Sequence, residues 1–245
     1  MLILLFAAAA WAGVQNALAG GGSFVTLPAL MLTGLDARAA NIASTIALFP
    51  GQVTTGLVGR RLVSGAAGLS FKALLAISLA GGAIGAVLLL ATPTHFFARL
   101  LPWLVLIATA LFAWGSWRPQ SEEKAARLSK AGAVAAQFAI AVYGGYFGGG
   151  IGFLMLAALS AAGLAVRAAG STKNVLAGAM NAAAVAIFLF TPAIPWARVG
   201  VVCAGAVLGG FVGARLLQRV DERWIRAFVV VLGVALTVGL FLRGR

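Results

Sequence analysis

Two glycine-rich stretches determine how this chain can fold, and they read Asn16-Ala17-Leu18-Ala19-Gly20-Gly21-Gly22-Ser23 and Tyr146-Phe147-Gly148-Gly149-Gly150-Ile151-Gly152. A glycine in a helix interior costs about 1 kcal/mol relative to alanine, so we expect a helix to end before each triplet and another to begin after it. The first amide groups of a helix have no partner within it and form a favourable anion site. The triplets therefore predict two helix starts, at Ser23 and Ile151, that face one anion. A second interpretation is that the glycines only permit close helix packing or a tight turn.

The composition around the triplets is that of a membrane protein. Hydrophobic residues make up 62% of the 245 residues and charged residues 9%, whereas a soluble protein carries about 25% charged residues. The chain is also too apolar to be disordered. A membrane helix needs about 20 apolar residues. The predicted fold class is therefore an all-α membrane protein, with helical segments at 2–19, 24–33, 39–58, 71–90, 99–117, 131–147, 151–166, 171–190, 199–217 and 227–242.

The sequence repeats itself once. The two glycine triplets are 128 positions apart, and so are the segments 81–86 and 209–214, which share a Gly-Gly-x-x-Gly-Ala pattern. Arg38 and Arg167, each followed by two alanines, are 129 positions apart. The repeated pattern indicates an internal duplication. Its small-xxx-small spacing also predicts that these two segments pack closely on other helices.

The duplication divides the chain into a first membrane repeat at 1–117, a cytoplasmic linker at 118–130 and a second membrane repeat at 131–245, with about five helical segments in each repeat. If each glycine-interrupted segment is a hairpin that returns to the side it entered from, each repeat crosses the membrane an odd number of times. The second repeat is then inverted relative to the first, both termini lie outside, and the interrupted helices meet near the midplane, where secondary transporters bind substrate. This arrangement follows the positive-inside rule, because only five of the 18 Lys and Arg residues are left outside: Arg38, Arg99, Arg198, Arg243 and Arg245.

Polar residues cluster in the third helical segment of each repeat, at Asn41, Ser44, Thr45, Gln52, Ser171, Thr172, Lys173, Asn174 and Asn181. Lys173 is the most informative of them, because an ionisable group inside a membrane segment indicates a functional site. Apolar sequence follows it, so we expect Lys173 at or just inside a helix start. The alternative is an interfacial lysine that reaches lipid phosphates. Four residues ahead of the triplets could bind a ligand or satisfy the broken backbone: Gln15, Asn16, Tyr143 and Tyr146.

Residue types for other chemistry are missing from the apolar segments. The acidic residues all lie in connectors, and the single histidine (His95) and single cysteine (Cys203) suggest no catalytic or metal-binding set. We therefore expect no enzyme, no cofactor and no metal. The net charge of +13 is explained by membrane orientation rather than by nucleic acid. An interior with hydrogen-bond donors and a lysine but no carboxylate favours an anion.

Three segments carry a family resemblance: the glycine run through Pro28 at 20–30, the stretch 34–40, and the second copy at 148–152 with 170–174. Together they resemble the TauE/SafE family of sulfite and organosulfonate exporters, and the resemblance covers essentially the whole chain. It implies a bacterial inner-membrane transporter of small sulfur-containing anions, in a family whose members include some assigned other organic anions. The second repeat departs from the pattern, because Leu156 stands where the first has Pro28. The related thiosulfate transporters rely on membrane cysteines, which Cys203 alone does not match.

We therefore expect a secondary transporter, an exporter of sulfite or organosulfonates that works by alternating access across the bacterial inner membrane. The alternative is a permease or channel for other small organic anions such as carboxylates. The expected partners are a small anion and the lipid bilayer, and homo-oligomer formation is left open. Arg38 and Arg167 would guard the entrances or orient the chain. The expected substrate-binding residues are Gly20, Gly21, Gly22, Ser23, Asn41, Ser44, Thr45, Gly148, Gly149, Gly150, Ile151, Thr172, Lys173, Asn174 and Asn181.

Overall fold

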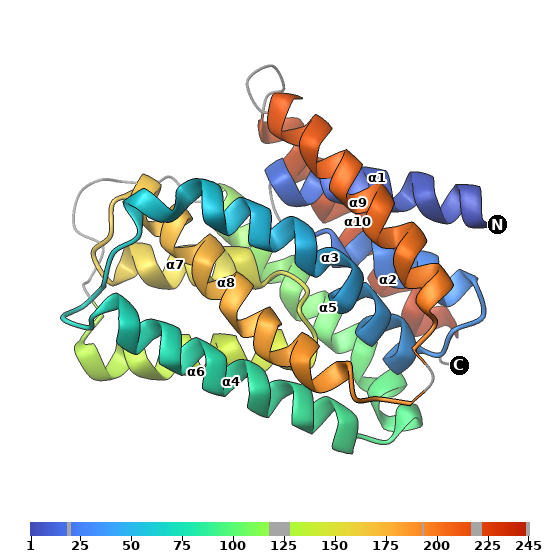
Figure 1. Cartoon of the computed structure of the whole chain (residues 1–245), viewed down its shortest axis with the longest axis horizontal. Coiled ribbons are helices and arrows are strands. Elements are labelled where there is room, and N and C mark those ends of the chain that lie inside the picture. Colours follow the sequence, from blue (N-terminus) through green and yellow to red (C-terminus); the bar gives the residue numbers. More distant parts are fainter. Residues whose placement is uncertain (19–20, 118–127, 193, 217–221, 244–245) are drawn as a thin grey trace.

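The computed structural model describes residues 1–18, 21–117, 128–192, 194–216 and 222–243. Within these ranges the chain folds into helices joined by short connections (Figure 1), which confirms the all-α class. A short 3₁₀ turn, Arg60–Leu62, follows the third helix. The helices are α1 (Leu2–Leu18), α2 (Ser23–Leu32), α3 (Ala37–Gly59), α4 (Phe71–Ala91), α5 (Thr94–Trp117), α6 (Lys130–Tyr146), α7 (Ile151–Ala161), α8 (Val166–Phe188), α9 (Trp196–Leu216) and α10 (Glu222–Arg243).

The predicted boundaries are wrong by five residues at several helix ends. α5 begins at Thr94 rather than at residue 99, and α10 begins at Glu222 rather than at residue 227, so Glu222 does not lie in a connector. The same error occurs between the second and third predicted segments of the second half. The predicted segment 151–166 ends at Ala161, and α8 begins at Val166 rather than at residue 171. Gly163 ends α7, because its φ of +93° lies in the left-handed region that favours glycine. The following helix then begins early enough to include Arg167, which lies between the two predicted segments.

The helix lengths are those of a membrane protein with some short elements. Among the described residues, three helical stretches are long and apolar enough to cross a membrane: Phe71–Ala91, Thr94–Trp114 and Trp196–Gly213. By contrast, α2 and α7 are apolar but have only 10 and 11 residues. A full crossing needs about 20 residues, so neither of these two helices can span a bilayer alone.

Glycines allow two pairs of helices to pack with their backbones in contact. A β-carbon on Gly85 of α4 would collide with the carbonyl oxygen of Val142 on α6. A β-carbon on Gly209 of α9 would likewise collide with the carbonyl oxygen of Ala10 on α1. The close packing predicted from the small-xxx-small spacing is therefore confirmed at these two glycines.

Two other helix pairs run antiparallel through the molecule. α3 and α8 cross at its centre (Figure 1), where Gln52 contacts Asn181 and Gly56 approaches Asn174, so the numbering rises along one helix as it falls along the other. In α5 and α10, the ring of Trp103 packs edge-on against Phe241 at 5.1 Å, and Gly233 approaches Thr109, so these two helices are also antiparallel. The N- and C-terminal ends lie at the same end of the long axis in Figure 1.

Candidate functional site

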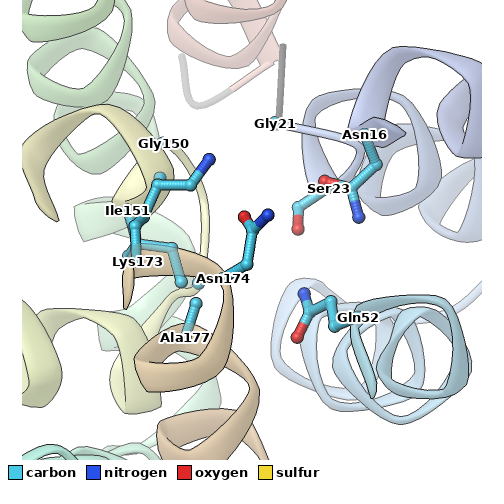
Figure 2. A pocket seen from close by; sticks show the side chains of 11 residues that line it. Asn16, Gly21, Ser23, Gln52, Gly150, Ile151, Lys173, Asn174 and Ala177 are labelled. Carbon is cyan, nitrogen blue, oxygen red and sulfur yellow. The ribbon is translucent and has the colours of Figure 1, made fainter. Parts of the chain in front are cut away.

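A cavity of about 60 Å³ lies where α1, α2, α3, α7 and α8 meet. A single water needs about 10–15 Å³ of such space, so the cavity has room for a few waters or one small ion. Backbone from both glycine stretches and side chains from the third helix of each repeat face it. Its lining consists of Asn16, Gly21, Ser23, Gln52, Gly148, Gly150, Ile151, Gly152, Lys173, Asn174 and Ala177 (Figure 2).

The second glycine stretch presents the start of α7 to the cavity. Gly150, the residue before the helix, has φ +75° and ψ 0°, a left-handed conformation that glycine adopts without strain. No side chain caps the helix at this point. The amide groups of Ile151 and Gly152 have no acceptor among the described residues. The cavity therefore meets unsatisfied N–H groups that carry partial positive charge.

The first glycine stretch is held by side chains from the end of α1. Gly21 has φ +82°, and its carbonyl oxygen accepts a hydrogen bond of 3.0 Å from Nε2 of Gln15. Oδ1 of Asn16 accepts a longer bond, 3.5 Å, from the amide of Gly22. Of the two roles considered for Gln15 and Asn16, ligand binding or hydrogen bonding to the broken backbone, both side chains fill the second. Asn16 also lines the cavity.

Lys173 is the one charged residue in this lining. The expectation that it lies at a helix start is wrong, because α8 begins at Val166 and Lys173 lies two turns further along. A β-carbon built on Gly152 would lie 3.6 Å from its Nζ, so the ammonium group lies beside the first turn of α7. Lys173 has no hydrogen-bond or ion-pair partner in the part of the chain that the structure describes. Its positive charge therefore adds to that of the α7 amides, and a bound anion would balance both.

Neutral polar side chains complete the lining. Figure 2 shows Lys173 and Asn174 on one side of the cavity, facing Asn16, Ser23 and Gln52 on the other. The side chains of Ser23 and Asn174 have no hydrogen-bond partner among the described residues, so both are free to bind a ligand. The arrangement offers a cation, hydroxyl and amide donors, and backbone amides, which is the donor set of an anion site.

The structure brings seven of the expected binding residues to the cavity: Gly21, Ser23, Gly148, Gly150, Ile151, Lys173 and Asn174. Gly22 and Gly149 are next to the cavity in sequence but are not in its lining. Gly20 lies outside the described residues.

The remaining expected residues have other partners. Nδ2 of Asn41 donates to the carbonyl of Tyr146 at 3.1 Å, which satisfies backbone at the end of α6. The hydroxyl groups of Ser44 and Thr26 are 2.6 Å apart. None of the expected residues in this group lines the cavity: Asn41, Ser44, Thr45, Thr172 and Asn181.

Thr172 and Thr45 bond to backbone, away from the cavity lining. Oγ1 of Thr172 accepts a hydrogen bond of 3.0 Å from the amide of Ser64, while Oγ1 of Thr45 donates to the carbonyl of Asn41, one turn earlier in α3, at 2.9 Å. The hydroxyls of Tyr143 and Tyr146, like the side chain of Gln15, also bond to other parts of the protein. Their roles are thus explained by hydrogen bonds within the fold.

Four lining residues were not among the expected binding residues: Asn16, Gln52, Gly152 and Ala177. Asn16 and Gln52 had been noted only as polar residues near the triplet and in the third segment. Gly152 has no side chain, and Ala177 has only a methyl group, so neither drew attention as a binding group. Ala177 could have been found from spacing, because it follows Lys173 by one helical turn and lies on the same face. Gly152 could have been found as the small residue that leaves room for a long side chain.

Arg38, expected to guard an entrance or to orient the chain, holds a helix end in place. Its Nη1 donates to the carbonyl of Thr92 at 2.8 Å and to that of Leu90 at 3.3 Å, so it satisfies free carbonyls at the end of α4. Arg167 is exposed in the first turn of α8.

Apolar helices, two of them too short to span a bilayer, surround a small polar cavity beside breaks in the helices. These features define an α-helical membrane protein with an internal polar cavity. The chain belongs to the TauE/SafE family of membrane transporters, because the family described as "Sulfite exporter TauE/SafE" matches residues 5–240. This match confirms the resemblance seen in the glycine stretches.

Relatives of nearly the same length have been named as transporters. A "Probable membrane transporter protein" of Haemophilus influenzae is 29% identical over 97% of this chain and 93% of its own length. "Probable membrane transporter protein ORF9" of Sinorhizobium sp is 30% identical over 98% of this chain and 92% of its own. "Probable membrane transporter protein YfcA" of Escherichia coli K12 is 25% identical, over 98% and 89%. No solved structure matches the chain.

Proposed function

We propose that this protein is a secondary transporter that moves small sulfur-containing anions, such as sulfite or organosulfonates, out across the bacterial inner membrane by alternating access. The observation that carries the proposal is the unpartnered Lys173 beside the free amides of Ile151 and Gly152. An uncompensated cation next to a helix start is costly in a low-dielectric interior unless an anion binds there.

The proposed mechanism needs two repeats of opposite orientation, with 1–117 and 131–245 as the units and 118–130 as a cytoplasmic linker. Two observations support this arrangement. First, the first helix of each repeat packs on the fourth helix of the other: α1 packs on α9, and α6 packs on α4. A twofold relation between the repeats requires such a reciprocal pair of contacts. Second, each of the pairs α3–α8 and α5–α10 joins the same helix of the two repeats, and both pairs are antiparallel. An axis in the membrane plane produces this relation.

We also propose that α1–α2 and α6–α7 are re-entrant hairpins, each of which enters the membrane and returns to the same side. Support comes from the short lengths of α2 and α7, neither of which can span a bilayer alone. Both termini would then lie outside, with the linker in the cytoplasm. The cavity would lie between the hairpin tips, at the place where alternating access opens a site to either side.

A permease or channel for other small organic anions, such as carboxylates, is the second candidate function, since the donors of the cavity would also bind a carboxylate. A binding screen of the purified protein against sulfite, sulfoacetate, methanesulfonate and acetate tests the choice. We expect the three sulfur anions to bind and acetate to bind more weakly. Binding of acetate alone would contradict the sulfur substrate and favour the second candidate.

A further inference from the structure

The second repeat contributes more residues to the lining of the cavity than the first repeat does. At the offsets that relate the repeats, Gly152 corresponds to Phe24 and Lys173 corresponds to Ser44. Phe24 is fully buried, and the Ser44 hydroxyl is engaged with Thr26. The first repeat therefore carries a phenyl ring and a neutral hydroxyl at the positions where the second carries a glycine and a lysine.

This asymmetry leaves one fixed charge in the cavity. The lining that the structure describes contains Lys173 and no acidic side chain, and its other polar side chains are neutral amides and a hydroxyl. Exact twofold copies would have supplied either two lysines or none. The start of α7 adds only a partial charge, about half of an elementary charge for a whole helix.

We propose, on the basis of the function proposed above, that this pocket binds one singly charged anion and discriminates against doubly charged anions of similar size. The desolvation penalty of an ion grows with the square of its charge, whereas its attraction to fixed charges grows only in proportion. A single ammonium group with neutral donors balances a monoanion, but it leaves a dianion with a large uncompensated cost. Monoanions of the expected class include hydrogensulfite and simple sulfonates.

Methanesulfonate and sulfate are suitable probes, because both are small tetrahedral sulfur anions and differ in charge. Equilibrium binding to the purified full-length protein should show methanesulfonate bound at least about tenfold more tightly than sulfate, which corresponds to about 1.4 kcal/mol. Sulfate bound as tightly as methanesulfonate, or more tightly, would overturn the proposed preference for singly charged anions (the charge rule), while leaving the proposed anion transport in place.

A second cation in the cavity should reverse the preference. Ala177 lines the cavity one turn after Lys173, so Ala177→Lys places a like charge beside it. The variant should shift the sulfate-to-methanesulfonate affinity ratio by about tenfold or more toward sulfate. Ala177→Met is the matched control: it adds a side chain of similar length without charge, and should weaken both anions equally. An unchanged ratio in a folded Ala177→Lys protein would overturn the proposal.

A second pair of probes separates the charge rule from the identity of the substrate. If the protein binds carboxylates and no sulfur anion, the proposed sulfur substrate fails, and acetate against oxalate then tests the charge rule. Acetate should bind more tightly than oxalate, and the reverse order would overturn the rule. If the purified, folded protein binds none of these anions, both the proposed function and the charge rule fail.

Discussion

Nδ2 of Asn181 donates a hydrogen bond of 2.6 Å to Oε1 of Gln52, a residue 129 positions earlier in the chain. That separation is the offset between Arg38 and Arg167, so the two side chains occupy corresponding positions in the two repeats. They meet where α3 and α8 cross, and Gln52 also lines the cavity. A contact between corresponding residues is expected at the twofold axis of the proposed inverted repeats, and here it lies at the wall of the proposed site.

We expect this pair to stabilise the crossing of the two repeats. Asn181 is buried, so Gln52→Leu would leave its amide without this partner and should cost about 1–3 kcal/mol. Asn181→Leu should cost a similar amount, while the double variant should cost less than the sum of the two. Thermal unfolding in detergent, analysed as a double-mutant cycle, measures the coupling. Additive losses would show that the two side chains act independently.

Replacing a glycine with alanine should lower the stability of the protein only where the backbone of another helix lies against that glycine. Gly85→Ala adds a β-carbon against the Val142 carbonyl and should destabilise the protein by about 1–3 kcal/mol. Gly239→Ala is the matched control, because no heavy atom lies within 4 Å of the β-carbon position. It should be neutral or stabilise α10 by about 0.5–1 kcal/mol. Equal melting temperatures for the two variants would contradict the packing account.

The proposed hairpins predict which residues share a side of the membrane. In a Cys203→Ser background, Ile3→Cys and Leu32→Cys should both react with a membrane-impermeant thiol reagent added outside intact cells. Ser129→Cys, near the end of the proposed linker, should react only after the cells are opened. If Ile3→Cys and Leu32→Cys reacted from opposite sides, α1 and α2 would cross the membrane and the hairpin would be ruled out.

The charge rule predicts a pH dependence that comes from the substrate. As pH rises through neutrality, hydrogensulfite loses its proton and becomes a dianion, so the apparent affinity for total sulfite should fall. The affinity for methanesulfonate, which keeps one charge, should stay constant. Lys173 is the only titratable side chain in the described lining, and the hydroxyls of Tyr143 and Tyr146 bond to Leu104 and Thr92. A parallel fall for methanesulfonate would assign the effect to the protein.

Local sequence predicted the helices well because their causes are local. The glycine triplets lower helix propensity over a few residues, and α1 and α6 end shortly before them while α2 and α7 begin shortly after. The small-xxx-small spacing correctly indicated close contacts at Gly85 and Gly209. The start of α8 was missed because Arg167 looked like a connector residue, whereas Gly163 had already turned the chain.

The site was harder to predict because the direction in which a side chain points around the helix axis matters as much as its position in the sequence. Thr172, Lys173 and Asn174 are consecutive, yet successive side chains on a helix point about 100° apart. Thr172 therefore bonds to Ser64, while the two residues that follow it line the cavity. Polar residue type alone could not separate these roles, since the partners come from segments distant in sequence.

Uptake of radiolabelled sulfite into proteoliposomes tests the central claim most directly, with wild-type protein compared with Lys173→Met and with Lys72→Met, an exposed lysine at the start of α4. We predict saturable uptake by the wild type that methanesulfonate inhibits, loss of at least about tenfold in Lys173→Met, and unchanged uptake in Lys72→Met. Folded Lys173→Met protein that transports sulfite at the wild-type rate would contradict the role given to the cavity.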